Sequence, residues 1–238
     1  MTESRFDDFA AEFSQTKPAD YADLLARRAA KGAQVAELLR SHLDSRCPTS
    51  ARNARSNIHN NGFVKLALWR HPETQASIRV HVWQPHAGDR VPAPSVHDHR
   101  WDFASMVIAG RLHFANYDER ECADGTWILR QVSDADADGS KQTRRSTRCE
   151  LRETCSYELG PGLVHALDHR QLHRTPAPRS YAATLVLIAR PARNFSRVAK
   201  PLSQDPEGRL TQSRALEPAE ICRHIEEIIG RSDAAPRA

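Results

Sequence analysis

Two histidines separated by one residue give the sequence its clearest chemical signal. His97 and His99 stand in a segment that continues into an apolar run and ends at Gly110. Side chains alternate between the faces of a β-strand, so histidines two positions apart point the same way on a strand but cannot share a helical face. Two imidazoles on one face can converge on a metal ion. A catalytic metal also needs a third ligand and an open position.

The histidines downstream are the candidates for that third ligand. His165, His169 and His173 share parity, so a straight strand would place all three on one face. Parity alone leaves the choice between His165 and His173 open. We expect His169 to be a neighbour of the site or to face solvent. We expect His81 and His113 to be ordinary strand residues.

The elements that must position these histidines are short strands between helical ends. Turn signals separate seven or more apolar or alternating segments, which predicts an all-β sandwich or small barrel. Strong helix formers fill residues 5–45, and residues 217–229 form an amphipathic helix with Pro218 in its first turn and Gly230 at its end. The expected units are an N-terminal helical cap at 1–50, a β-barrel at 51–200 and a C-terminal tail at 201–238.

One polar stretch invites a different interpretation. Residues 134–148 have low hydrophobicity and opposite charge blocks, which predicts an exposed, mobile loop. Asp134, Asp136 and Asp138 alternate like the start of a calcium-binding loop. The position that needs the later glutamate of such a loop holds Arg145, which excludes that site.

Composition excludes several classes of function. The chain has 238 residues, 39% of them hydrophobic and 27% charged, which is ordinary for a globular protein. The net charge of +4 comes mainly from scattered arginines, and aromatic residues make up 6%, so nucleic-acid binding is not expected. No apolar run approaches the roughly 20 residues of a membrane helix, and the N-terminus is acidic and polar. We therefore expect a cytoplasmic protein without a membrane partner.

The histidine segments resemble the two conserved motifs of the cupin superfamily. In the first motif a His-x-His pair precedes a strand and a glycine, as do His97 and His99. In the second, the metal-binding histidine stands about eleven positions after a Pro-Gly turn, which counted from Gly162 is His173. A shorter Pro-Gly-x-x-His form makes His165 the alternate third ligand. The resemblance implies an all-β cupin fold, a double-stranded β-helix or jelly-roll barrel.

Within that superfamily the chain is most similar to the cysteine-dioxygenase-like group. That group has an Ile/Val-His-Asp-His segment after a Trp-containing strand, then Leu-His-Arg, then a strand ending near proline. The corresponding residues are 96–99, 172–174 and 185–191. The similarity spans roughly residues 52–195 and leaves out both helical ends.

The resemblance also implies roles for individual side chains. In this group an arginine just before the first strand of the sheet binds the substrate carboxylate, and Arg55 is the nearest match, with Arg52 as the alternative. Tyr181, Asp102 and Trp101 are candidates for lining the site or for fixing the ligands.

The sequence departs from the family pattern in two features. Many cupins carry a glutamate that three or four residues separate from the second histidine, and those positions hold Phe103 and Ala104 in this chain. Animal cysteine dioxygenases cross-link a cysteine to a tyrosine, and the matching positions hold Ala104 and Ile188. The cross-link is therefore excluded, which leaves cysteine in doubt as the substrate.

These features together predict an enzyme. Three neutral imidazoles leave a metal with its full charge and an open side, which favours an anionic substrate beside dioxygen. We expect a mononuclear non-heme iron oxygenase, with Fe(II) as cofactor, that oxidises a small thiol- or carboxylate-bearing metabolite with O2. The alternatives are a cupin isomerase or lyase using zinc, manganese or nickel, and a non-catalytic ligand-binding cupin. A monomer and a homodimer are both compatible with the sequence.

Overall fold

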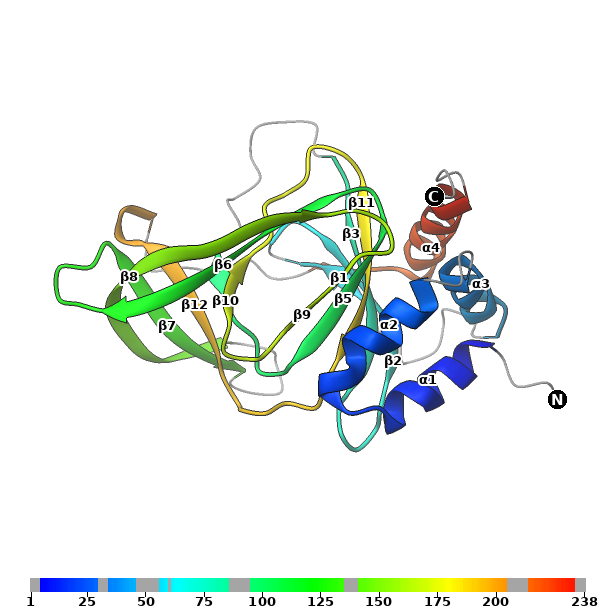
Figure 1. The fold of residues 1–238 in the computed structure, drawn as a ribbon, viewed down its shortest axis with the longest axis horizontal. Helices are drawn as coiled ribbons and strands as arrows, with labels where there is room; N and C mark the ends of the chain where they lie inside the picture. The colour runs from blue at the N-terminus through cyan, green and yellow to red at the C-terminus, as the bar shows by residue number, and fades with distance from the viewer. Residues whose placement is uncertain are drawn as a thin grey trace.

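The chain folds into a β-sheet that lies between a layer of helices and a small β-barrel (Figure 1). The computed structural model describes residues 5–29, 34–45, 56–59, 61–85, 95–134, 141–204 and 214–233. The prediction of an all-β barrel with an N-terminal helical region and a C-terminal helix is confirmed.

The sheet has seven antiparallel strands in the order β13-β1-β2-β3-β11-β5-β9. Their bounds are Arg214–Ala215 (β13), Asn57–Ile58 (β1), Val64–Arg70 (β2), Ser77–Trp83 (β3), Ala182–Ile188 (β11), Phe103–Ala109 (β5) and Val164–Leu167 (β9). Every residue of β5 and β11 is buried, because one face packs on helices and the other faces the barrel.

Six strands close the barrel in the order β10-β4-β12-β7-β8-β6. Their bounds are Leu172–Arg174 (β10), Val96–His97 (β4), Ser196–Pro201 (β12), Trp127–Asp134 (β7), Lys141–Leu159 (β8) and Leu112–Glu121 (β6). β4 and β10 are the shortest of these, and they pair directly with one another. These two strands carry histidines of the predicted site.

Four helices cover the outer face of the sheet: Arg5–Gln15 (α1), Tyr21–Ala29 (α2), Gln34–Ser45 (α3) and Pro218–Asp233 (α4). Short 3-10 turns lie at Pro18–Asp20 and Leu202–Gln204. Fully buried side chains of the helices, such as Phe9, Leu24 and Ile225, share one core with Leu66 and Ile78 of the sheet. Each such side chain contributes about 1.5–3 kcal/mol by leaving water. α3 and α4 contact each other, so both ends of the chain close the same layer (Figure 1).

Strand β3 shows how the sheet separates its two environments. Ile78, Val80 and Val82 belong to the core under the helices. Arg79 and His81 alternate with them and therefore point toward the barrel. The sequence pattern predicts this division of faces, and the structure confirms it.

Two boundary predictions are wrong. Residues 141–148, expected to be loop, form the first part of β8 and pair with β7 along its length. Their polar side chains fit a strand because an antiparallel sheet can expose one face to water. Gly230, expected to end the last helix, lies inside α4, which continues to Asp233. The acidic residues at 135–140 lie outside the described residues.

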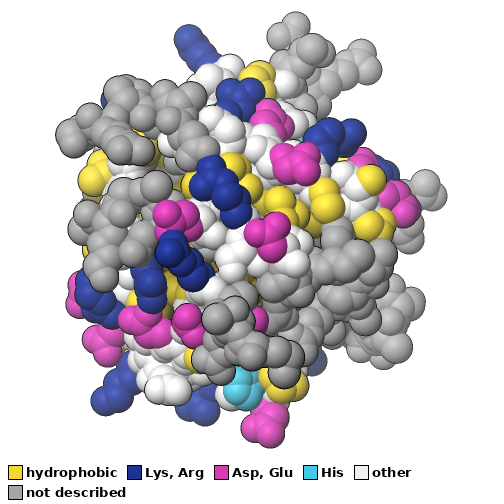
Figure 2. Space-filling view, turned by 90° about the vertical axis from the view of Figure 1, so that its right-hand side faces the viewer, with side chains coloured by type: hydrophobic (Ala, Val, Ile, Leu, Met, Phe, Trp, Pro, Cys, Tyr) yellow, Lys and Arg dark blue, Asp and Glu magenta, His cyan; other side chains and the backbone are white. Residues whose placement is uncertain are grey.

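Figure 2 views the molecule from the helical side. On this face Lys and Arg side chains are interspersed with Asp and Glu side chains among the residues described. None of the described helices combines the length and the apolar character that a membrane crossing requires.

Gly110 provides a test of how tightly β5 and β6 are joined. Its φ is +71°, and a Cβ built there would lie 2.0 Å from the carbonyl oxygen of Tyr181. We expect Gly110→Ala to lower the free energy of unfolding by about 2–4 kcal/mol, from the left-handed backbone and the clash together. Urea unfolding of the wild-type protein and of Gly110→Ala measures this difference in the free energy of unfolding.

The matched control is Gly230→Ala, because a Cβ there meets nothing within 4 Å and the residue is helical. That variant should gain up to about 1 kcal/mol from helix propensity. Equal effects of the two substitutions would contradict the packing seen at Gly110.

Candidate metal centre

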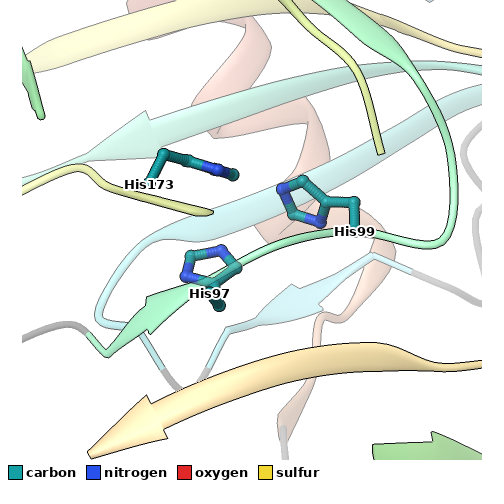
Figure 3. A group of neighbouring side chains, drawn as sticks. All are labelled: His97, His99 and His173. Carbon is teal, nitrogen blue, oxygen red and sulfur yellow. The ribbon is translucent and has the colours of Figure 1, made fainter. Parts of the chain in front are cut away.

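Three imidazoles converge in the region between the barrel and the sheet (Figure 3). His97 lies in β4, His99 follows it after one residue, and His173 lies in β10. One ligand atom from each lies within 4.8 Å of the others. His97 and His173 meet because they are directly opposite in the β4–β10 pair. His99 joins them because alternation returns it to the face of His97.

Backbone carbonyls fix the orientation of two of these rings. Nδ1 of His97 donates to the carbonyl oxygen of Ser95 at 2.9 Å. Nδ1 of His173 donates to the carbonyl oxygen of Gln171 at 3.1 Å. A histidine that donates from Nδ1 keeps the lone pair on Nε2, which is the usual arrangement of a metal-binding histidine. Both rings are therefore held in a ligand-competent tautomer.

The charge state also suits metal binding. Burial lowers the pKa of His99 well below its usual value of 6.5, and the neighbouring His173 and His97 lower it further. Burial likewise lowers the pKa of His173. Neutral imidazoles are the form that coordinates a metal, so near neutral pH no proton has to be displaced from these two rings.

Aromatic side chains surround the group. The ring of Trp101 stacks on His99 with centroids 5.8 Å apart, and Phe103 meets His99 edge-on at 5.0 Å. Among the described residues the ligand group contains three imidazoles and no carboxylate. The donor set therefore consists of imidazole nitrogens alone, and it could hold a divalent metal ion of the iron, nickel or zinc type.

A buried carboxylate holds the back of the His-x-His segment. Asp98 has a fully buried side chain that forms ion pairs with Arg193 and Arg197. Arg197 also pairs with Glu119, and Arg193 donates from Nη2 to the carbonyl oxygen of His99 at 2.8 Å. Because Asp98 points opposite to its two neighbours, these contacts fix the direction of both histidines.

Asp102 hydrogen-bonds the turn that precedes the third histidine, His173. Its Oδ1 accepts hydrogen bonds from the backbone N–H and from Nδ1 of His169, each at 2.8 Å. His169 lies in the turn between β9 and β10, just before His173. The structure thus places Asp102 beside His169 rather than in contact with a member of the histidine group.

Tyr181, a candidate for lining the site, lies on the helix-covered face of the sheet. Its side chain belongs to the core under the helices, and the guanidinium of Arg231 in α4 lies 4.0 Å from its ring centroid. The cause is alternation, since Tyr181 shares a face with the helix-facing Ala183 and Leu185. Arg55 and Arg52 lie outside the described residues.

His165, the alternate third ligand, is not part of the converging group. It lies in β9, where its ring packs against Phe114 with centroids 4.1 Å apart. Burial lowers the pKa of His165 to about 4, so the ring is neutral near pH 7. Of the two candidates for the third position, the structure brings His173 to His97 and His99.

Two polar residues that sequence analysis set aside or missed face the site from β3. Arg79 and His81 share its barrel-facing side, and both lie close enough to lower the pKa of His99 electrostatically. The guanidinium of Arg79 lies 5.2 Å from the ring centroid of Trp101. The one sequence signal for these two residues was the alternation of polar and apolar side chains along the strand. A strand with one face in solvent shows the same alternation, so the pattern could not identify them as site residues.

No family model matches this chain, and no curated protein matches it. Solved structures that resemble it include one of DMSP lyases, at 16% identity over 87% of this chain and 96% of that one, with a TM-score of 0.35. A cupin-2 domain protein from Rhodospirillum rubrum matches at 9% identity over 72% and 80%, with a TM-score of 0.31.

Two other kinds of structure match at a similar level. Hydroxypropylphosphonic acid epoxidase from S. wedmorenis matches at 11% identity over 79% of this chain and all of that one, with a TM-score of 0.34. The chain spans only 30% and 32% of two structures of CapF, one of them from Staphylococcus aureus. Since all these likenesses are weak, we argue the function from the residues of the site.

Removal of the charge on Asp98 tests whether the back of the site is held electrostatically. Asp98→Asn leaves two arginines without their shared buried partner, so the free energy of unfolding should fall by about 3–5 kcal/mol. Glu158→Gln is the control, because its pair with Arg111 is exposed and should contribute under about 1 kcal/mol. Denaturant unfolding of the metal-free proteins would refute the idea if the two losses were equal.

The enclosed histidines also predict how stability depends on pH. The pKa of His165 is about 4 in the folded protein, whereas the same ring takes up a proton near pH 6.5 when unfolded. The unfolded state then binds more protons, so stability falls as pH drops from about 6.5 to about 4, by about 1.4 kcal/mol per unit for this residue.

The lowered pKa values of His81, His99 and His173 act in the same direction. Urea unfolding in the presence of a chelator, at about pH 7.5, 6.5 and 5.5, measures the slope. His165→Leu should reduce that slope, and an unchanged slope in this variant would show that the ring is protonated when folded.

Proposed function

We propose that the chain is a metal-dependent enzyme of the cupin type, and specifically a mononuclear non-heme iron oxygenase that oxidises a small thiol- or carboxylate-bearing metabolite with O2. The observation that carries this proposal is the group of three converging imidazoles, two of them kept neutral by burial, with no carboxylate among the described residues of the group. When bound there, ferrous iron would supply oxygen activation and hold both reactants close together.

The residues around the group favour an anionic substrate. Neutral ligands leave the charge of a divalent ion uncompensated, and Arg79 adds a positive charge from β3. A guanidinium suits a carboxylate because its planar fork can donate two parallel hydrogen bonds. Arg79 is thus a second candidate for binding a carboxylate, beside the sequence-based candidate Arg55. Trp101 and Phe103 would limit the access of water.

Metal content and oxygen uptake test this function together. Protein purified without a His-tag should carry near-stoichiometric iron, and His97→Ala and His173→Ala should lose it. His165→Ala is the matched control and should keep the metal, because this histidine is outside the converging group. An oxygen electrode should then record uptake with members of a panel of small thiols and carboxylates.

Other outcomes identify the alternatives. Turnover that needs zinc, manganese or nickel and consumes no oxygen would replace the oxygenase by an isomerase or lyase. Ligand binding that survives loss of all three histidines would leave a non-catalytic binding protein. Iron lost in His165→Ala but kept in His173→Ala would contradict the ligand set seen in the structure.

A further inference from the structure

Polar atoms without partners gather on the His173 side of the metal centre. Both ring nitrogens of His165 and the Oδ1 atom of Asn116 are buried and have no hydrogen-bond partner among the described residues. The whole side chain of His165 is nearly inaccessible, since the residue is 8% exposed. Leaving such groups unpaired costs about 1–3 kcal/mol each, and native proteins rarely do so without a reason.

The fold brings these atoms together from opposite walls. His165 is in β9 of the sheet, and Asn116 is in β6 of the barrel, directly opposite His173 in the β6–β10 pair. Opposed residues of antiparallel strands share a face, so Asn116 points to the same side as His173. His173 also lies close enough to His165 for that ring to affect its pKa.

Neighbouring side chains fix the orientation of both groups. Phe114 packs on the imidazole of His165, with centroids 4.1 Å apart, and Tyr157 lies 6.4 Å from the same ring. Burial raises the pKa of Tyr157, and a hydrogen bond from the side-chain amide of Asn116 to the Tyr157 hydroxyl acts in the opposite direction. The amide nitrogen is thereby assigned, and the atom of Asn116 that stays unpaired is the carbonyl oxygen.

The chemistry of the unpaired atoms defines what could satisfy them. A carbonyl oxygen only accepts hydrogen bonds, so its partner must be a donor. A neutral imidazole offers one N–H and one lone pair, so it can bind a group that both donates and accepts. A hydroxyl group meets both requirements, and an uncharged amine does so as well.

We propose that His165 and Asn116 form a substrate subsite beside His173 that binds a hydroxyl or amino group of the small acid. The acid group itself lies toward Arg79 and His81, on the His99 side of the centre. This inference rests on the proposed function only in taking the metal centre to be where the substrate binds. It gives His165 a binding role, which explains why a polar side chain lies at a position that otherwise contacts aromatic rings.

Calorimetric titration of the full-length protein tests the subsite without any turnover. Metal-free and zinc-loaded proteins are titrated with matched probes, lactate against propionate and 3-hydroxybutyrate against butyrate. Wild type should bind the hydroxylated member of at least one pair about tenfold more tightly, as expected for a hydrogen bond to a buried group. In His165→Leu the preference should fall to within about twofold.

A surface histidine provides the control. His113 is exposed on β6 and bonds to Ser156, so His113→Leu should keep the preference for the hydroxylated probe. His165→Gln retains a hydrogen-bond donor and an acceptor, so it should keep part of the preference for the hydroxylated probe. This variant tests the subsite if His165→Leu does not fold. The melting temperature of metal-free His165→Leu should equal or exceed that of wild type, because unpaired buried atoms are removed.

Equal binding of both probes by wild type would overturn the subsite, and so would a preference that persists in His165→Leu. A lower melting temperature of His165→Leu together with an unchanged preference would assign His165 a structural role. Failure of the oxygenase proposal is separate, since it would appear as missing iron or missing oxygen uptake while the preference in the zinc-loaded protein remains.

Discussion

The geometry of the three-histidine group depends on one buried carboxylate. Asp98 has no exposed surface, and burying its charge would be costly without the two arginines that meet it. Arg193 and Arg197 come from the segment that follows β11, and Arg197 lies in β12, which pairs with β4. The ion pairs thus join two strands at the point where β4 ends. His97 and His99 flank Asp98 in the sequence. Because the Asp98 carboxylate is held on one side of the chain, the two imidazoles must point to the other side.

The same alternation explains how much of the site could be predicted from sequence. Spacing by two residues is a local property, so the common direction of His97 and His99 needs no tertiary information. The division of β3 into an apolar face and a polar face is local in the same way, and so are the amphipathic terminal helices. The choice between His165 and His173 could not be made from spacing alone. Parity assumes one straight strand, whereas the chain turns between β9 and β10.

Apart from the end of α4, the predictions that failed required knowledge of what faces a strand from elsewhere in the chain. Residues 141–148 are polar on both sides, and only their pairing with β7 makes them a strand. Tyr181 shares a face with Ala183 and Leu185, and which of the two faces α4 covers is not visible in the local sequence. Arg79 and His81 alternate as solvent-facing residues do, and only the barrel above them turns that face into an interior. The partners of Asp98 lie on segments too distant for any local pattern to reveal.

The pairing of β4 with β10 has a consequence for the order of events in biosynthesis. These strands are only two and three residues long, and they come from segments far apart in the chain. His173 therefore reaches His97 only after the intervening strands have been made and the barrel has closed. Closing so long a loop costs chain entropy before the contact contributes, which slows the formation of such long-range pairs. A metal ion bound by this histidine group would then be taken up by the folded protein and not by a nascent chain on the ribosome.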